Sequence, residues 1–334
     1  MTTILCFYHA PCNDGSGAAA ALHHRLAEHG MLEGTDIRFC PMTYNTEWNE
    51  PFHANYLHHE IVPKHPVKEI YLLDVSFSKV KYDQLIQHLR ATEKLATEKP
   101  RTVCIDHHES ARQQREELLQ FCDEAVIEMG PGLSGATLVW NYFNNAWGVA
   151  TETPALLRYI ADQDIWEWAL PNSAEINAAL NTMDGYVDSM QHLLNEFLAN
   201  PDGVLARLLS EGRGIVKMVD AQVAKVMHHT VDLHVDGVTI RVVNSSAFSS
   251  ELGNFLCNHS HDKPNAIGLI YSIQEDWAVR CSIRSIEGGK LNARQLAERF
   301  GGGGHNHASG CRFRNYQEFQ AALNRGFRGA EEAE

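Results

Sequence analysis

Short hydrophobic runs alternate with helical patterns through the first half of the chain. The β-rich runs at 3–9, 69–75 and 101–105 are separated by segments with the spacing of amphipathic helices. This alternation is typical of a parallel sheet with crossover helices. Because each run ends in polar residues, we predict a doubly wound α/β domain with a polar crevice beyond the carboxyl ends of its strands.

The pattern changes near residue 190. Leu193, Leu194, Phe197 and Leu198 repeat at helical spacing, and a second apolar helical stretch covers 215–227. Strand candidates follow at 238–244, 266–273 and 278–284, and then a helix, a glycine run and a final helix. We therefore predict an α/β domain at 1–190, a helical linker at 191–230 and a smaller α/β domain at 231–328.

Composition and charge narrow the classes of function. The 334 residues, 44% of them hydrophobic, exceed what one core usually organises. A formal net charge of −14 argues against the broad basic surface that a long nucleic acid requires, but it is compatible with a small anionic ligand in a local pocket.

Targeting signals and disulfides are not expected. No apolar run reaches the roughly 18 residues of a membrane helix, and the first residues lack the features of a signal peptide. Eight cysteines without a Cys-x-x-Cys pair suit a reducing compartment. We expect a cytoplasmic protein without membrane contact.

Candidate metal ligands follow three predicted strands. Asp106-His107-His108 ends one strand, Asp74 ends another, and the segment from His9 to Gly15 forms the first strand-to-helix turn. Carboxylate and imidazole groups bind divalent metals, and the carboxyl ends of parallel strands meet at one edge of the sheet. These groups are expected to converge on one site, although Asp and Asn after a strand also serve as caps and turns.

A helical segment adds a further acid. Asp162 and Asp164 lie two residues apart on a helical pattern, so only one of them is expected to face the site. We choose Asp162, because it shares a stripe with Arg158 and Tyr159 that can meet the sheet.

Two more segments have alternative roles. Ser134 and Thr137 open another helix, where their hydroxyls are expected to cap it rather than contact a substrate. Trp166 and Trp168 follow the acids of the previous segment and belong either to the core or to a surface on which a base stacks.

The ordered motifs resemble those of a known family. His9 with Asp14, then Asp74, Asp106-His107-His108 and Asp162 resemble the four motifs of the DHH phosphoesterase superfamily, and GGGGHNHASG at 301–310 resembles the glycine-rich motif of its DHHA1 domain. The resemblance implies a doubly wound catalytic domain that binds manganese, a linker helix and a smaller substrate-binding domain. Members include RecJ-like exonucleases, nano-RNA phosphodiesterases, exopolyphosphatases and inorganic pyrophosphatases, so the fold does not settle the substrate.

The resemblance also implies roles for individual residues. Metal ligands are implied at Asp14, Asp74, His107 and Asp162, with Asp74 bridging two ions. His108 resembles a substrate or leaving-group contact and is assigned to catalysis together with Asp106. The implied cofactor is Mn²⁺, as one or two ions, and other divalent metals are allowed. Two ions roughly 3.5 to 4 Å apart can activate water and stabilise an in-line displacement.

The first motif departs from the family pattern, in which a His is followed by an Asp four residues on and by another two beyond. Cys12 stands where the first Asp belongs, and counting back from Asp14 puts Tyr8 at the His position, with His9 displaced by one. His9 and Cys12 are therefore added as candidate ligands. Cys12 either binds as a thiolate, which favours iron or zinc, or is a buried thiol at a tight turn.

The smaller domain offers a candidate phosphate site. Gly302, Gly303 and Gly304 have no Cβ, so their backbone N–H groups can approach a phosphate, and His305 can donate to an anionic oxygen. Arg284 stands at the position of a DHHA1 arginine, and a guanidinium group binds phosphate bidentately. The alternative for the glycines is a flexible loop.

Together these features favour a hydrolase, a metal-dependent phosphodiesterase that cleaves short oligoribonucleotides or diribonucleotides such as pGpG to mononucleotides. The acidic balance disfavours an exonuclease for long strands. A phosphomonoesterase or exopolyphosphatase would use the same residues without a base-binding surface. A catalytically weak nucleotide-binding protein is the third reading, motivated by Cys12, and a homodimer is compatible with all three.

Overall fold

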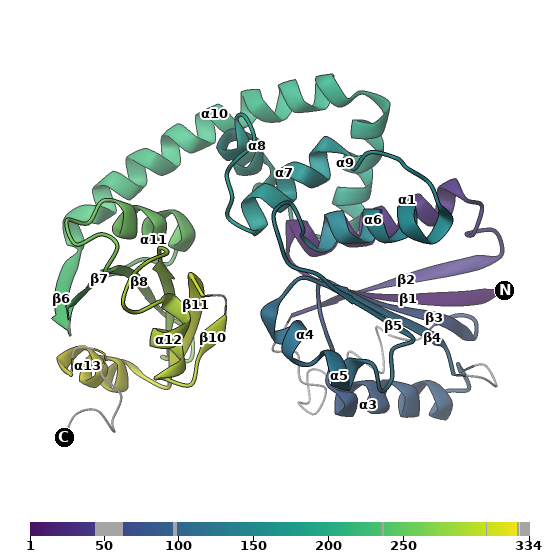
Figure 1. Ribbon diagram of the computed structural model, residues 1–334, viewed down its shortest axis with the longest axis horizontal. Helices are drawn as coiled ribbons and strands as arrows, with labels where there is room; N and C mark the ends of the chain where they lie inside the picture. The colour runs from purple at the N-terminus through teal and green to yellow at the C-terminus, as the bar shows by residue number, and fades with distance from the viewer. Residues whose placement is uncertain (44–62, 96–98, 236, 305, 326, 328–334) are drawn as a thin grey trace. The chain divides into compact units, whose positions relative to one another are not determined.

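The computed structural model describes residues 1–43, 63–95, 99–235, 237–304, 306–325 and 327 (Figure 1). The chain divides into two compact units, Met1–Val216 and Lys217–Glu334, and the division falls within the long helix α10 (Pro201–Val226). Val204 and Leu208 of this helix are buried in the core of the first unit. The first unit therefore extends beyond residue 190, and part of the segment predicted as a linker packs with it.

A five-stranded sheet forms the centre of the first unit. Its strands are β1 (Thr2–His9), β2 (Thr35–Met42), β3 (Val67–Leu73), β4 (Arg101–Asp106) and β5 (Glu124–Ile127). All neighbours are parallel, in the order β2-β1-β3-β4-β5. The predicted doubly wound parallel sheet is thus confirmed, with two edge strands that the hydrophobic pattern did not indicate. β2 is mostly half-buried and β5 has only four residues, so neither presents a long apolar run.

Helices cover both faces of this sheet (Figure 1). On one face lie α1 (Asn13–Glu28), α6 (Gly135–Trp147), α7 (Ala155–Asp164), α8 (Ser173–Leu180) and α9 (Val187–Ala199). On the other lie α3 (Lys79–Ala91) and α5 (Arg115–Leu118), with α4 (Glu109–Gln113) directly before α5. Alternate side chains of β1 enter the two cores, as a central parallel strand requires.

The strand order determines where a ligand can bind. The chain runs from β1 to β2 on one side of β1 and then crosses to β3 on its other side, so the direction of strand order reverses between β1 and β3. Open parallel sheets bind ligands outside the carboxyl ends of their strands at this switch point. His9 ends β1, Asp74 follows β3 and Asp106 ends β4, so all three lie at that edge.

The second unit is a smaller α/β structure built on a mixed sheet. Its strands are β6 (Val231–Val235), β7 (Val238–Asn244), β8 (Ala266–Ile273), β9 (Val279–Ser285), β10 (Gly303–Gly304) and β11 (Ala308–Phe313), in the order β10-β11-β9-β8-β7-β6. Only the β7 and β8 pair is parallel among these neighbours. The predicted second α/β domain is confirmed.

Helices again pack on both faces. A short 3₁₀ helix, η2 (Met227–His229), leads into the sheet, and α11 (Ser249–Asn258) contributes Leu252 and Leu256 to one core. The other core contains Leu296 of α12 (Ala293–Glu298) and Phe319 of α13 (Tyr316–Asn324). No helix in the described part of the chain is both long and apolar enough to cross a bilayer.

Candidate metal centre

Asp74 is held at the edge of the sheet by an unusual backbone conformation. Its φ is +56°, a left-handed value that Asp tolerates better than most residues, and its N–H donates to the carbonyl of Ile105 at 2.9 Å. The side chain is 1% exposed. The turn after β3 thus points a buried carboxylate at the end of β4.

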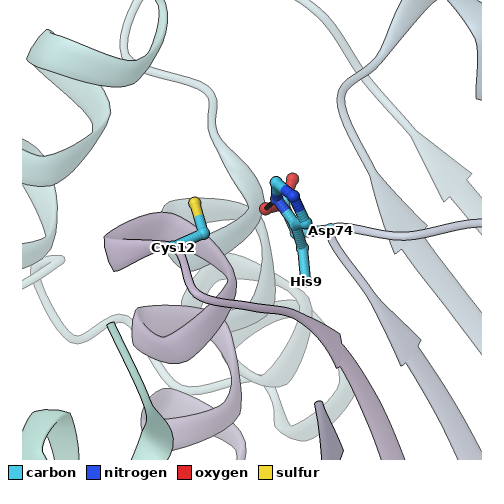
Figure 2. A group of neighbouring side chains, drawn as sticks. All are labelled: His9, Cys12 and Asp74. Carbon is cyan, nitrogen blue, oxygen red and sulfur yellow. Dashed lines mark hydrogen bonds and ion pairs between the residues drawn. The ribbon is translucent and has the colours of Figure 1, made fainter. Parts of the chain in front are cut away.

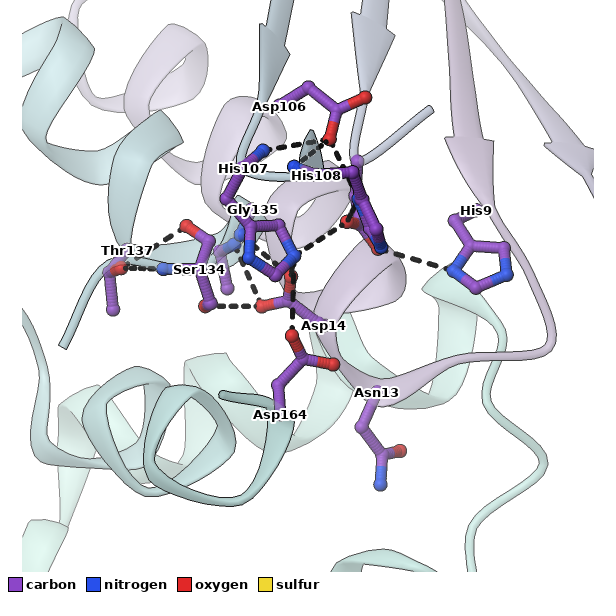
Figure 3. Close-up of polar contacts among 12 residues, drawn as sticks. His9, Asn13, Asp14, Asp106, His107, His108, Ser134, Gly135, Thr137 and Asp164 are labelled. Carbon is purple, nitrogen blue, oxygen red and sulfur yellow. Dashed lines mark hydrogen bonds and ion pairs between the residues drawn. The ribbon is translucent and has the colours of Figure 1, made fainter. Parts of the chain in front are cut away.

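Asp106 organises the triplet that follows β4. It is fully buried, and its Oδ1 accepts hydrogen bonds from the N–H groups of His107 and His108, at 2.7 and 2.9 Å, and from Nδ1 of His108 at 2.8 Å (Figure 3). These contacts fix both the backbone turn and the ring of His108. Asp106 was predicted as a catalytic residue, and its contacts are those of a group that positions the two histidines.

His107 lies among three carboxylates. Its Nε2 is 3.2 Å from Oδ1 of Asp74, 3.2 Å from Oδ2 of Asp164 and 3.7 Å from Oδ2 of Asp14 (Figure 3). The imidazole is 5% exposed. Three acids from α1, α7 and the turn after β3 therefore meet at one ring nitrogen.

The start of α6 fixes Asp14. Ser134 Oγ donates to Oδ1 of Asp14 at 2.5 Å, and the N–H groups of Gly135 and Ala136 donate at 2.6 and 3.0 Å. Thr137 Oγ1 accepts from the N–H of Ser134 at 2.9 Å, as expected of a helix start. The capping prediction accounted for this turn, but it did not indicate that the helix N-terminus also binds a carboxylate from α1.

Gly135 makes this close approach possible. A Cβ at this position would lie 2.7 Å from Cβ of Asp74 and 2.8 Å from Oδ2 of Asp14, distances that packed atoms do not tolerate. The sequence shows a glycine at a helix start, which is common, so its packing role became visible only in the fold.

The structure brings Asp164, rather than the predicted Asp162, to His107. The carboxylate of Asp162 accepts backbone N–H groups of Ala169 and Leu170, at 2.8 and 3.2 Å, and so closes the loop after the helix. Asp164, the last residue of α7, reaches His107 instead. Asp162 is buried, but Arg158, which was predicted to share its stripe, is exposed, and the carboxylate of Asp162 serves the loop.

The first motif contributes His9 rather than Tyr8. His9 Nδ1 lies 3.3 Å from Oδ2 of Asp74, whereas the hydroxyl of buried Tyr8 accepts from the N–H of Val187 at 3.3 Å. Cys12 joins His9 and Asp74 in a group whose potential ligand atoms all lie within 4.8 Å of one another (Figure 2). His9 and Cys12, which were added as candidate ligands because the first motif departs from the family pattern, are therefore brought together with Asp74.

Crowding of the acids changes their proton affinities. Burial and the neighbouring charge of Asp74 raise the pKa of Asp14 to about 6, and burial together with Asp14 raises the pKa of Asp164 to about 7, although its side chain keeps 28% exposure. Burial opposes protonation of His107, but Asp74 and the other acids outweigh it and raise its pKa to about 10. Burial raises the pKa of Asp74, and hydrogen bonds from His107 and His9 outweigh it, so this pKa falls below its usual range.

This electrostatic arrangement fits a divalent cation. Without a metal, a proton on His107 balances part of the charge of three carboxylates; a divalent ion would balance it better. Asp14, His107 and Asp164 form one group with ligand atoms within 4.8 Å, and Asp74, His107 and His108 form another. Carboxylate oxygen and imidazole nitrogen suit Mn²⁺, Zn²⁺ and similar ions, so the donor set does not select one metal.

The second unit contains most of the predicted substrate-binding residues. Arg284 donates to Ser250 Oγ at 2.9 Å and to the carbonyl of Ile283 at 3.0 Å, and no carboxylate pairs with it among the described residues. A Cβ on Gly302 or Gly304 would come within 2.2 and 2.7 Å of carbonyl oxygens of β11, whereas Gly303 faces open space. Two glycines of the run are thus needed for the hairpin itself, and His305 lies outside the described residues.

Known proteins resemble both the sequence and the fold. Residues 236–327 match the model of the DHHA1 domain family. An uncharacterised protein of Acanthamoeba polyphaga mimivirus is 23% identical over 319 residues, which cover 92% of this chain and 66% of that protein, so the chain spans just under two thirds of its relative's length.

Two solved structures share the fold over almost the whole chain. An exopolyphosphatase-related protein from Bacteroides fragilis is 16% identical, covers 98% of this chain and 91% of its own, and has a TM-score of 0.54. Exonuclease RecJ bound to manganese is 13% identical, with 99% and 90% coverage and a TM-score of 0.53. At these identities the likeness is one of fold.

Proposed function

We propose that the chain is a metal-dependent phosphoesterase of the DHH/DHHA1 superfamily that acts on short nucleotides, because residues 236–327 match the DHHA1 domain family and the whole chain shares the fold of the exopolyphosphatase-related protein and of RecJ. The observation that carries this proposal is the convergence of Asp14, Asp74 and Asp164 on Nε2 of His107 at the switch point of the sheet. A site with this excess of negative charge favours a divalent cation, and a cation there attracts a phosphate.

The residues of the site have separable roles. Asp14, Asp74, His107 and Asp164 would hold the metal, which supplies positive charge to polarise a phosphoryl oxygen and to activate water. Asp106 accepts from Nδ1 of His108 and so fixes the orientation of its ring. Although burial opposes it, the bond to Asp106 raises the pKa of His108, which suits a group that donates a proton to a leaving oxygen.

Aromatic residues beside the site support a nucleotide rather than a simple phosphate chain. Trp166 follows Asp164 by two residues, is 38% exposed and packs edge-on against Trp168 with ring centroids 5.0 Å apart. Both tryptophans have left-handed φ values, of 62° and 53°, in the loop that Asp162 closes. Bulky residues rarely adopt this conformation, and such strain is often found at ligand sites. An exposed indole can stack on a base.

The second unit supports recognition of a terminal phosphate. β11 pairs with both β10 and β9, so Gly303 and Arg284 lie on nearby strands of one sheet. A guanidinium group that forms no ion pair with any described residue, together with an uncovered glycine backbone, is suited to an anionic group. A diribonucleotide such as pGpG carries a 5′-phosphate that this surface would bind.

A side-by-side assay tests the substrate. The full-length protein with Mn²⁺ is given pGpG, a longer oligoribonucleotide, a nucleotide 3′,5′-bisphosphate and polyphosphate. We expect the highest kcat/KM for the dinucleotide, loss of turnover in His107→Ala, and unchanged turnover in His192→Ala, which replaces an exposed histidine of α9. Turnover of polyphosphate alone would replace the nucleotide proposal with an exopolyphosphatase. Binding of pGpG without turnover would favour a nucleotide-binding protein.

A further inference from the structure

Cys12 differs from the other cysteines of the chain. All eight cysteines lie in the described residues, and the other seven are buried, whereas Cys12 is only partly covered. Its sulfur lies with a ring nitrogen of His9 and a carboxylate oxygen of Asp74 within 4.8 Å (Figure 2). Side chains from three separate segments, the end of β1, the residue before α1 and the turn after β3, thus present sulfur, nitrogen and oxygen to one another.

Two glycines hold this group in position. The N–H of Cys12 donates to the carbonyl of Gly185 at 3.1 Å, and a Cβ on Gly185, whose φ is +73°, would lie 2.8 Å from that nitrogen. A Cβ on Gly15 would lie 2.1 Å from the carbonyl oxygen of His9. Both sides of the turn between β1 and α1 are therefore packed too tightly for any other residue, which limits the freedom of Cys12 and His9.

The donor set of this group differs from that around His107. We propose that His9, Cys12 and Asp74 form a cation position that prefers zinc, iron(II) or cobalt(II) over manganese, beside an oxygen-rich position formed by Asp14, His107 and Asp164. Thiolate sulfur favours such ions, whereas carboxylate oxygen suits manganese. The inference concerns the identity of the ion and does not depend on the substrate proposed above.

Binding requires the thiol to lose its proton. In the metal-free protein, burial and the charges of Asp74, Asp164 and Asp14 raise the pKa of Cys12, so the sulfur is held as S–H. A divalent ion between Cys12 and Asp74 reverses that electrostatic balance: the S–H proton passes to solvent and a metal–sulfur bond forms. Cys12 also directly precedes α1, where the helix N-terminus favours a negative sulfur.

Cobalt(II) is the probe that tests this proposal. The full-length protein, reduced and without oxygen, is titrated with Co²⁺ while absorbance and bound metal are measured. We expect a near-ultraviolet thiolate-to-cobalt charge-transfer band in the wild type. It should be absent from Cys12→Ser and unchanged in Cys122→Ala, which alters a cysteine buried in a separate core. Thermal melts confirm that each variant is folded.

Metal competition provides the second measurement. Loss of a residue that only hydrogen-bonds to a metal ligand weakens metal binding roughly 10- to 100-fold. Because Cys12 would bind the ion directly, Cys12→Ser should weaken zinc binding by more than this. Cys12→Asp should shift the ratio of zinc to manganese affinity toward manganese. A charge-transfer band that survives in folded Cys12→Ser, a wild type that binds cobalt without the band, or a wild type that binds no divalent ion would each overturn the proposal. Absence of turnover in the substrate assay, with cobalt and zinc binding as expected, would contradict the proposed phosphoesterase activity but not this metal site.

Discussion

The acids of α7 give the sharpest test of the site, because two carboxylates two residues apart have different tasks. Asp162 accepts two backbone N–H groups of the following loop, whereas Asp164 lies 3.2 Å from the ring of His107. Substituting each in turn by Asn removes one negative charge and almost no volume. We expect Asp162→Asn to lower stability and Asp164→Asn to lower metal affinity.

The size of the first effect follows from the hydrogen bonds. Asn keeps one oxygen acceptor but turns an N–H₂ group toward the other backbone donor, so one N–H of Ala169 or Leu170 loses its partner. Such a loss costs about 1 to 3 kcal/mol. At roughly 2 to 4 °C per kcal/mol for a domain of this size, the melting temperature should fall by about 2 to 12 °C.

Asp164→Asn should behave in the opposite way. Removing one of three crowded carboxylates relieves repulsion with Asp14 and Asp74, so the metal-free protein should be as stable as the wild type or more so. Saturation of the wild type at about 100 times Kd stabilises it by roughly 2.7 kcal/mol, and this gain should shrink in the variant.

Thermal melts in EDTA and in Mn²⁺, with calorimetric titration of the metal, separate the two outcomes. If Asp162→Asn lost metal binding while it melted normally, and Asp164→Asn bound metal like the wild type, the assignment of the two acids would be refuted.

Three further predictions concern the same centre. Asp106→Asn keeps the oxygen that accepts from His107 and His108 but loses the negative charge that, despite burial, raises the pKa of His108. It should therefore leave metal binding intact, reduce kcat/KM by about 10- to 100-fold and alter its pH profile; an unchanged profile would contradict this role of Asp106. Gly135→Ala should weaken metal binding, because its Cβ would displace Asp14 and Asp74, whereas Gly214→Ala, in open space on α10, should stabilise the helix without affecting the metal. The pKa values of Asp14 and Asp164 are raised in the folded state, to about 6 and 7, so the folded metal-free protein keeps protons that the unfolded chain releases. The free energy of unfolding should therefore decrease as the pH rises from about 4 through 7. Melts in EDTA should show this fall and Mn²⁺ should oppose it most strongly above pH 7; a melting temperature that rises with pH in EDTA would contradict the reasoning.

Several features of this protein were determined by the sequence alone. The apolar runs of β1, β3 and β4 are long enough to indicate buried strands, and polar residues at their ends predicted one shared site. The strands β7 and β8 were predicted with the bounds observed. Such features depend on short-range pattern, which burial on a sheet imposes directly on the chain.

Only the tertiary structure decided which side chains meet. Periodicity gives the direction of Asp162 and Asp164 about their own helix axis, but not that a loop would take the first and His107 the second. The same holds for Gly135, whose neighbours lie more than 60 residues away, and for His9, which meets Asp74 while Tyr8 turns toward Val187. Contacts between distant segments leave no periodic signal, because they depend on the packing of several elements at once.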